Sequence, residues 1–553
     1  MINQLGFNNY KAFKFGEIHF KPITVLLGAN SVGKSSIIQL LLLLAQTAND
    51  QKNISALKIN GDNVSLGSNI NLFRLKDTST PITLKFKLDK TFNDILSNIF
   101  SYLYTLLHIE HMNLERFGYE AISKVLNKTH FMAYIAKSEE NFNEICNLID
   151  KGYVQYQNIS SYFINPHKSA TKNYIEDYLS TYRILKTIQN AIQTYKDNVF
   201  CSVGIGHNAA NRDKTNILYV EHICIFFTND SERKDLINLS ITKPLSRATI
   251  HLSSDILENI KTFDEELSKH KNQILQDVRA NLFSYFSKNL DNEFIINRNQ
   301  RDYSLPLDSI VNILQKTIKN IEENLNKDNI NYVSPLRAYP KRYYFLDRTR
   351  ATTSLDTLNG NDIAATLKNN EDLKRQVNNW LKHFKLQIDV HTLEDVIHKV
   401  KVKQDKLQLD ITDVGFGISQ VLPIIVQGFF TKSNTMTVIE QPEVHLHPKM
   451  QADLADLFID IALPENKNGK RYHNKSLLIE THSEYILKRL RRRIADKTIS
   501  YNDVGIYYIE RSEDNMSTIR EIDISKTGVF EWPKEFYDGE LLNDMLDYLK
   551  YQA

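Results

Sequence analysis

Residues Gly28–Ser35 read GANSVGKS and directly follow the apolar, β-branched run Ile23–Leu27. The pattern GxxxxGKS between a strand and a helix is typical of a phosphate-binding P-loop, whose glycines allow a tight loop of backbone N–H groups around a phosphate. The helix that should follow, from Ser36 to Ala45, is apolar apart from Gln39 and therefore belongs in a core against a sheet. This stretch predicts nucleotide binding on an α/β fold.

The residues of this loop have separate predicted roles. Lys34 should pair with the β- and γ-phosphates, and Ser35 should offer its hydroxyl to Mg²⁺. ATP and Mg²⁺ are the cofactors that this chemistry implies. The other predicted contacts to the nucleotide in this stretch are Asn30, Ser31, Gly33 and Ser36.

The composition narrows the class of protein. The 553 residues are too many for one compact core, and such a length allows about two to four domains. Lys and Arg number 68 and Asp and Glu 66, so any surface for nucleic acid or membrane must be a local patch. No apolar run approaches the roughly 20 residues that span a bilayer, the N-terminus lacks a basic signal region, and the three cysteines form no CxxC pair. We expect a cytoplasmic protein with no membrane partner.

A second motif lies far along the chain. Residues 435–440, TMTVIE, form a hydrophobic strand that ends in a carboxylate, which is the form of a Walker B element. Glu440 is therefore expected to hold Mg²⁺ together with Ser35. It lies roughly 400 positions after Lys34, although the two elements normally share one small domain. The ATPase head must then be assembled from both chain ends around a large insertion.

The spacing of apolar residues divides the chain in the same way. Residues 1–90 are rich in strands and form the N-terminal part of the predicted head. Residues 91–330 have apolar spacings of three and four, which predict a mainly helical insertion with one strand-like patch at 217–227. Residues 331–553 form the C-terminal part of the head and carry the second set of motifs.

Two polar segments flank the acidic strand. Residues 413–420, DVGFGISQ, precede an apolar helix, and glycines with a serine at a helix start can bind the γ-phosphate. The predicted contacts there are Gly415, Gly417 and Ser419. Downstream, the strand at 476–480 is followed by His482, which could sense the γ-phosphate.

The order of these motifs resembles the ABC-type ATPases of the SMC, RecF and OLD group. In that group the Gly/Ser loop is the signature motif that completes the ATP site of the opposite subunit, and the histidine is a switch residue. The resemblance implies a head-to-tail dimer, or a higher oligomer, around ATP and Mg²⁺. It also implies that Glu440, the residues after it and His482 form the catalytic group.

Further segments narrow the resemblance. Residues 440–448, EQPEVHLHP, are similar to a segment of OLD-like prokaryotic AAA ATPases, and residues 5–13 are similar to their opening strand. In that strand a basic residue approaches the nucleotide, a role that falls on Lys11. Residues 333–340 and 528–536 resemble the Septu-type anti-phage defence ATPases, which also occur in retron systems. This resemblance implies a separate nuclease partner of the HNH type, with nucleic acid bound directly or through that partner.

One departure from the ABC pattern bears on mechanism. The residue after the magnesium carboxylate is usually a Glu that polarises the attacking water, but here it is Gln441. An amide cannot take the proton as a base, although it can orient water. Either Glu443 or a neighbouring group substitutes, or hydrolysis is slow and the ATP-bound dimer persists. We favour slow turnover.

Several features have two interpretations. His445 and His447 could bind a metal, but no cysteine or third histidine accompanies them, so a loop at a dimer interface is favoured. The basic run at 488–493 could contact phosphates or simply be a solvated helix face. About 70 residues follow His482 and contain no DxD pair, so the Toprim nuclease domain of OLD proteins is not expected.

These observations leave three hypotheses about function. The first is an ATP-dependent regulator of a partner nuclease in phage defence. The second is a RecF-like DNA-binding repair ATPase that acts without a nuclease. The third is a nucleotide-sensing scaffold in which hydrolysis is incidental.

Overall fold

The computed structural model divides the chain into two compact units, which are described separately. The first unit comprises Met1–Asn53, Leu57–Ile82 and Glu322–Ala553, and the second comprises Ile54–Ala56 and Thr83–Ile321. The structure describes residues 2–50, 55–88, 92, 94–96, 169–195, 198–209, 216–229, 232–242, 245–258, 260–278, 281–284, 304–326, 328–337, 339–345, 361–393, 397–414, 416–466, 468–512, 514 and 516–533.

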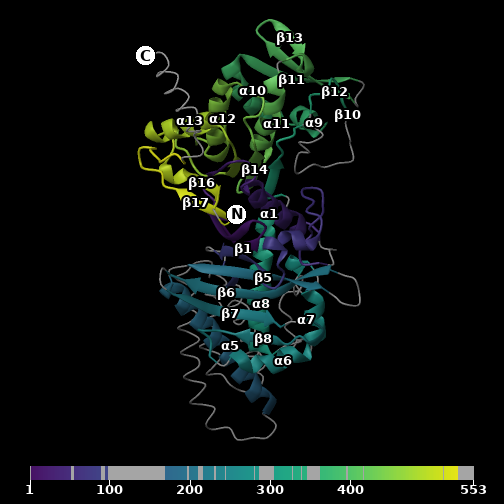
Figure 1. Cartoon of the computed structure of the whole chain (residues 1–553), viewed down its shortest axis with the longest axis vertical. Coiled ribbons are helices and arrows are strands. Elements are labelled where there is room, and N and C mark those ends of the chain that lie inside the picture. The colour runs from purple at the N-terminus through teal and green to yellow at the C-terminus, as the bar shows by residue number, and fades with distance from the viewer. Residues whose placement is uncertain are drawn as a thin grey trace, which may run out of the picture. The chain divides into compact units, whose positions relative to one another are not determined.

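The first unit is built on a mixed sheet whose strands come from both chain ends (Figure 1). In spatial order the strands are β1 (Gln4–Tyr10), β2 (Phe13–His19), β17 (Ser517–Ile522), β16 (Val504–Arg511), β3 (Ile23–Leu27), β15 (Ser476–Glu480), β14 (Met436–Glu440) and β9 (Ile330–Val333). The five strands from β16 to β9 are parallel. Their carboxyl ends therefore share one edge, which is where ligands bind in open α/β sheets. The predicted α/β head assembled from both chain ends is confirmed.

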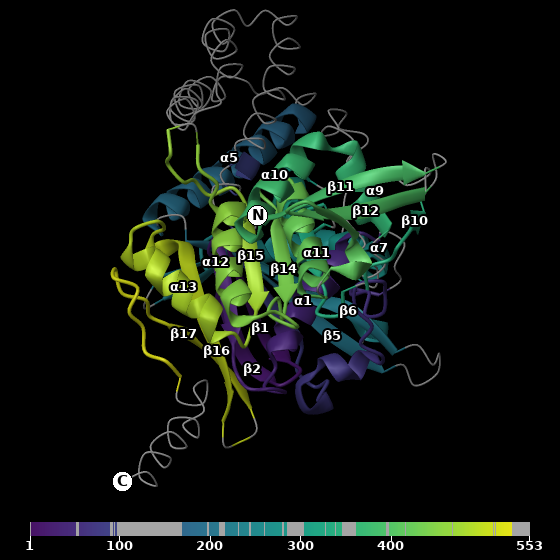
Figure 2. The ribbon, with the colours of Figure 1, turned by 90° about the horizontal axis from the view of Figure 1, so that it is seen from above.

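Helices and a smaller sheet complete this unit. The helices are α1 (Lys34–Ala48), α9 (Asn361–Asn369), α10 (Glu371–Leu381), α11 (Phe416–Phe430), α12 (Pro448–Ala462) and α13 (Glu484–Ala495). The smaller sheet contains β10 (Tyr344–Phe345), β11 (Leu386–Leu393), β12 (Ile397–Gln404) and β13 (Leu407–Asp410). Figure 2 shows α11 and α12 beside β14 and β15.

One apolar core joins the sheet to these helices. Alternate residues of β3, which are Ile23, Val25 and Leu27, are fully buried in a cluster that also holds the apolar faces of α10 to α13. A strand that is buried on both faces has a continuous run of apolar residues. Such runs in the sequence predict β3, β14 and β15. Helix α1 is buried along most of its length. The core thus fixes the three strand ends at which the site lies.

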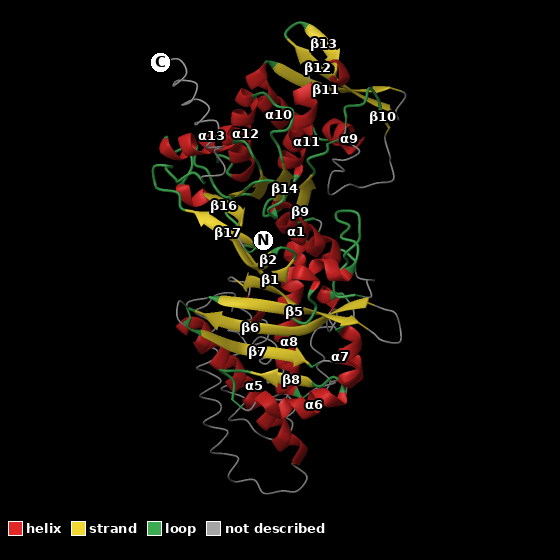
Figure 3. Ribbon diagram, in the orientation of Figure 1, coloured by secondary structure: helices red, strands yellow, loops and turns green. Residues whose placement is uncertain are grey.

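The second unit contains both strands and helices (Figure 3). Its strands are β4 (Ile82–Leu88), β5 (Val199–Ala209), β6 (Asn216–Thr228), β7 (Arg233–Ile241) and β8 (Ile250–Ser253), and β5 to β8 pair in succession as antiparallel neighbours. Its helices are α5 (Ser169–Thr194), α6 (Asp264–Lys269), α7 (Lys271–Asp277) and α8 (Leu305–Leu325).

The described part of the insertion is therefore richer in strands than the sequence indicates. Within the insertion, the sequence predicts a strand only at 217–227, and this segment forms β6. Strand β5 carries Gly204, Gly206 and Asn208, residue types that are poor strand formers. Its pairing with the apolar β6 outweighs that local preference. Residues 97–168, which include Cys146, and residues 285–303 lie outside the described residues.

No helix among the described residues has both the length and the apolar character needed to cross a membrane. Cys201 and Cys224, in the second unit, are buried and free. Burial raises the pKa of both thiols.

Candidate functional site: the P-loop and two neighbouring strand ends

The loop after β3 has the geometry of a phosphate-binding loop. Gly28 has φ 146°, and a Cβ atom there would lie 2.3 Å from the carbonyl oxygen of Ile509 on β16. Only glycine fits such a position. Gly33, at φ 114°, is the N-terminal cap of α1, so the positive end of the helix dipole faces the loop. The exposed residues of the segment Gly28–Ser35 are Ala29, Asn30, Ser31 and Ser35.

Lys34 is buried at the base of this loop. Its Nζ atom donates to the carbonyl oxygens of Gly28 (3.0 Å) and Ala29 (2.7 Å) and lies 3.8 Å from Oε1 of Glu480. The Lys34 side chain is only 4% exposed. Burial lowers the pKa of Lys34, while the charges of Glu480 and Glu443 act in the opposite direction. A buried cation at the start of α1 is placed to meet an anionic ligand.

Glu480 is a site residue that the sequence analysis did not select. In the sheet, β15 lies between β3 and β14, so Glu480 is nearer to the P-loop than Glu440 is. Its Oε2 atom accepts a hydrogen bond from Oγ of Ser35 at 3.4 Å. Burial, followed by the charge of Glu440, raises the pKa of Glu480 to about 7, against the effect of Lys34. The available signal was a second buried strand ending in a carboxylate, like the one at Glu440.

Glu440, the predicted magnesium ligand, ends β14 beside Glu480. The two residues are register partners in the parallel β14–β15 pair. Oε1 of Glu440 accepts a hydrogen bond from the hydroxyl of Tyr332 on β9 at 2.7 Å. Glu440 is thus fixed from one side by β9 and faces the carboxylate of its neighbour.

The donors at this edge fit a magnesium ion that also binds a nucleotide. They are the Ser35 hydroxyl and the carboxylates of Glu480 and Glu440, all of which are hard oxygen ligands. Magnesium usually takes one or two carboxylates and completes its shell with water and phosphate oxygens. Within the described part of the chain, no group of three or more His, Cys, Asp and Glu side chains is placed to hold a metal ion.

The turn after β14 is tied to both of its neighbours. Gln441, at φ 44°, donates its backbone N–H to the carbonyl oxygen of Glu480 at 2.8 Å. Arg337, which follows β9, donates from Nη2 to the carbonyl oxygens of Glu440 and Gln441, both at 3.0 Å. Burial lowers the pKa of Arg337 to about 10, and the charge of Glu443 opposes this shift. Arg337 lies in the segment 333–340 that carries the resemblance to Septu-type ATPases, and the sequence alone assigns it no role.

Glu443 and His482 meet beside the P-loop. Oε1 of Glu443 accepts from the backbone N–H of His482, and Oε2 accepts from Oγ1 of Thr481, both at 2.7 Å. The imidazole of His482 is exposed. Desolvation and the positive charge of Lys34 lower its pKa. The structure therefore brings together Lys34, Ser35, Glu440, Glu443 and His482, with Glu480 among them.

The other predicted contacts are placed differently. Nζ of Lys11 donates to Oε1 of Gln39 on α1, and burial lowers the Lys11 pKa. Ser36 donates its backbone N–H to the carbonyl oxygen of Gly33 at 3.0 Å. Gly415 lies outside the described residues. Gly417 is partly exposed in the first turn of α11, whereas Ser419 is buried, so Gly417 is the more accessible of the two.

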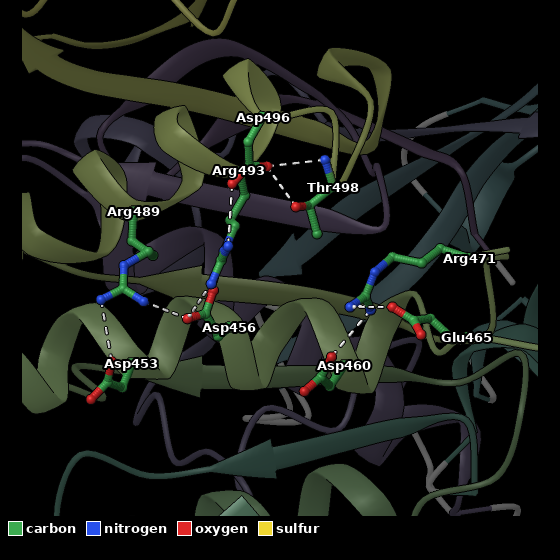
Figure 4. Close-up of polar contacts among 9 residues, drawn as sticks. All are labelled: Asp453, Asp456, Asp460, Glu465, Arg471, Arg489, Arg493, Asp496 and Thr498. Atoms are coloured by element: carbon green, nitrogen blue, oxygen red, sulfur yellow. Dashed lines mark hydrogen bonds and ion pairs between the residues drawn. The ribbon is translucent and has the colours of Figure 1, made fainter. Parts of the chain in front are cut away.

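Two features with open interpretations now have structural roles. Nδ1 of His447 accepts the backbone N–H of Lys449 at 3.3 Å and caps α12. In the basic run, Arg489 and Arg493 form ion pairs with aspartates of α12 (Figure 4). Their charges are largely neutralised, which leaves fewer cations for contact with phosphates.

The geometry of the strand end, the loop and the helix defines a P-loop ATPase. Comparison with known proteins agrees: the chain belongs to the AAA ATPase domain family, whose model matches residues 1–487. A search of curated proteins finds no match.

Solved structures that resemble the chain include two heads of SMC proteins. The SMC head domain from Thermotoga maritima is 7% identical with a TM-score of 0.31, and the match covers 95% of this chain and 99% of that one. An Smc head domain with an extended coiled coil, bound to the C-terminal domain of ScpA derived from Pyrococcus furiosus, is 10% identical with a TM-score of 0.31 and 99% coverage of both chains.

Proposed function

We propose that this chain is an ABC-type ATPase that binds ATP and Mg²⁺, hydrolyses ATP slowly and dimerises head-to-tail around the nucleotide. The observation that carries this proposal is the meeting of Lys34 and Ser35 with Glu480, a residue from the other end of the chain. Lys34 would hold the β- and γ-phosphates, and Ser35 with Glu480 and Glu440 would hold Mg²⁺. Bound magnesium would neutralise charge on the phosphates during transfer.

The protein groups have distinct proposed parts in the reaction. The N–H groups at the start of α1 bind phosphate oxygens. His482 lies within the electrostatic reach of Lys34 and senses the γ-phosphate. Gln441 orients the attacking water without accepting its proton, so turnover is slow and the ATP-bound dimer is long-lived.

Glu480→Gln is the variant that tests the magnesium assignment. The amide keeps the shape of the side chain but removes one charged ligand, so we expect Mg²⁺-dependent ATP hydrolysis to fall roughly 10-fold to 100-fold, the cost typical of a lost metal-site partner. Titration of activity with Mg²⁺ should show a higher requirement. Glu465→Gln, at an exposed ion pair with Arg471, is the matched control. An unchanged magnesium requirement in Glu480→Gln would remove Glu480 from the site.

Gly417→Glu tests dimerisation through the Gly/Ser segment. A Cβ at Gly417 lies 3.4 Å from the Leu446 side chain, so a side chain can be accommodated, whereas the buried Ser419 is a poor position for a test. The new carboxylate would face the γ-phosphate of the opposite subunit, and like charges at an interface cost several kcal/mol, or about 10²-fold in affinity. Sedimentation velocity should show a monomer with ATP, while Lys406→Glu, in an exposed turn, assembles normally. Unchanged assembly of Gly417→Glu would reject the ABC-type geometry.

We further propose that the ATP-bound dimer controls a separate nuclease of the HNH type in prokaryotic anti-phage defence. The support is the resemblance of residues 333–340 and 440–448 to Septu-type and OLD-like ATPases. Copurification of the chain with the products of neighbouring genes tests this. The alternative is a RecF-like repair ATPase, and it would be favoured by salt-sensitive DNA binding by the purified chain alone. The ion pairs of Arg489 and Arg493 with Asp456 reduce the charge that the basic run at 488–493 can offer to phosphates.

A further inference from the structure

The segment after β14 and the segment after β15 are joined by a row of side-chain contacts. The first contact is the Glu443 carboxylate, which reaches from the turn after β14 to the backbone of His482 and the hydroxyl of Thr481. The second is the Ser483 hydroxyl, which donates to Oε1 of Gln451 at 2.7 Å. Gln451 in turn donates from Nε2 to the carbonyl oxygen of Leu446 at 2.9 Å.

The third contact lies further along the two helices. Arg489 and Arg493 of α13 both bond to Asp456 of α12, and Arg489 also bonds to Asp453 (Figure 4). These bonds hold α12 and α13 in a fixed register, because each arginine presents a rigid fork to its carboxylate. Glu443 is the member of this row that lies next to the nucleotide site.

Glu443 is the acceptor at both of its carboxylate oxygens in these hydrogen bonds. The backbone N–H of His482 can only donate. The Thr481 hydroxyl accepts from the backbone N–H of Ser483 at 2.9 Å and donates its own proton to Oε2 of Glu443. Only a carboxylate accepts at both ends, because an amide presents an NH₂ group at one of them.

We propose that Glu443 is a positioning residue that fixes the backbone of His482 beside the P-loop, and that it is not the base that activates water. The inference rests on the proposed ATPase function, since it concerns the same site. Both carboxylate oxygens are engaged with the loop that carries His482. These two hydrogen bonds therefore hold the backbone of His482 in one place.

A double-mutant cycle on the full chain separates positioning from base catalysis. Single-turnover ATP hydrolysis is measured for the wild type, Glu443→Gln, His482→Ala and the double variant. A small displacement of a catalytic group can cost about 10²-fold, so we expect Glu443→Gln to slow hydrolysis by about that factor while ATP affinity stays within a few-fold. In the His482→Ala background, Glu443→Gln should add less than about a 2-fold change. An undiminished fall in that background would overturn the proposal.

The Thr481 pair keeps the proposal testable if Glu443→Gln fails to fold. Valine matches threonine in shape but lacks the hydroxyl, and serine keeps it. Thr481→Val should lower the hydrolysis rate, and Thr481→Ser should retain more activity than Thr481→Val. Equal rates for valine and serine would contradict a role for the Thr481–Glu443 bond.

Imidazole NMR resonances of His482 give a readout that does not depend on hydrolysis. We expect them to shift in Glu443→Gln and to stay in place in Glu465→Gln, an exposed Glu-to-Gln control. Resonances that do not move in Glu443→Gln would overturn the proposal. Failure of the ATPase function would instead appear as a wild type that neither binds nor hydrolyses ATP. The NMR comparison would still test whether Glu443 positions His482.

Discussion

Replacement of Lys34 by alanine should abolish ATP binding. The Lys34 ammonium is buried and already held by the carbonyl oxygens of the loop and by Glu480, so it is preorganised for the β- and γ-phosphates. Hydrogen bonds to charged groups are worth about 1.5–3 kcal/mol each, and loss of two such contacts weakens binding by about 10²-fold or more. Isothermal titration with ATP and Mg²⁺ measures the loss directly.

The same variant has a second expected effect. Without Lys34, the buried carboxylate of Glu480 loses its positive neighbour, and breaking a buried pair typically costs about 3–5 kcal/mol. The free energy of unfolding should therefore fall, and urea denaturation measures it. Lys58→Ala, which removes a partly exposed ion pair with Asp50, is the matched control. ATP affinity equal to that of the wild type in Lys34→Ala would reject the P-loop assignment.

Gln441→Glu should raise the hydrolysis rate by about 10²- to 10⁴-fold, the contribution of a positioned general base. The substitution preserves the size of the side chain and leaves the backbone bond from Gln441 to Glu480 in place. Faster hydrolysis would shorten the life of the ATP-bound dimer and uncouple it from its partner, although the residues that bind ATP are unchanged. Single-turnover hydrolysis measures the rate, with Gln408→Glu on an exposed strand as the control.

Two results would contradict the proposal that turnover is slow and the ATP-bound dimer is long-lived. A wild-type rate above about 1 s⁻¹, which lies within the ordinary range of enzymes, would show that turnover is not limited by a missing base. An unchanged rate in Gln441→Glu, together with a full loss in Glu443→Gln that persists without His482, would assign the base to Glu443. The hydrogen bonds of Glu443 to Thr481 and His482 make that second outcome unexpected.

The parts of the site that the sequence could predict are those with local signals. The spacing from Gly28 to Ser35 defines loop and helix start together, and the buried strands before Glu440 and Glu480 are continuous apolar runs. Which of the two carboxylates meets Ser35 depends on strand order. That order is set by packing between distant segments, and nothing in the local pattern shows that β15 lies between β3 and β14.

Arg337 and Ser419 show a similar limit. The role of Arg337 comes from a side chain that crosses from the end of β9 to the turn after β14, and no spacing in the sequence links those two segments. Ser419 lies in a glycine-rich segment typical of an anion-binding loop, but α11 already begins at Phe416. Its hydroxyl is buried as a consequence.

The position of β3 has a consequence for biosynthesis. Both of its neighbours, β15 and β16, come from the last part of the chain. At roughly 5–20 residues per second, translation needs about half a minute to a minute and a half to reach them. Until then the apolar strand Ile23–Leu27 has no partner on either edge and is exposed to mispairing with other chains. The nascent chain is therefore expected to be most prone to aggregation before β15 and β16 are synthesised.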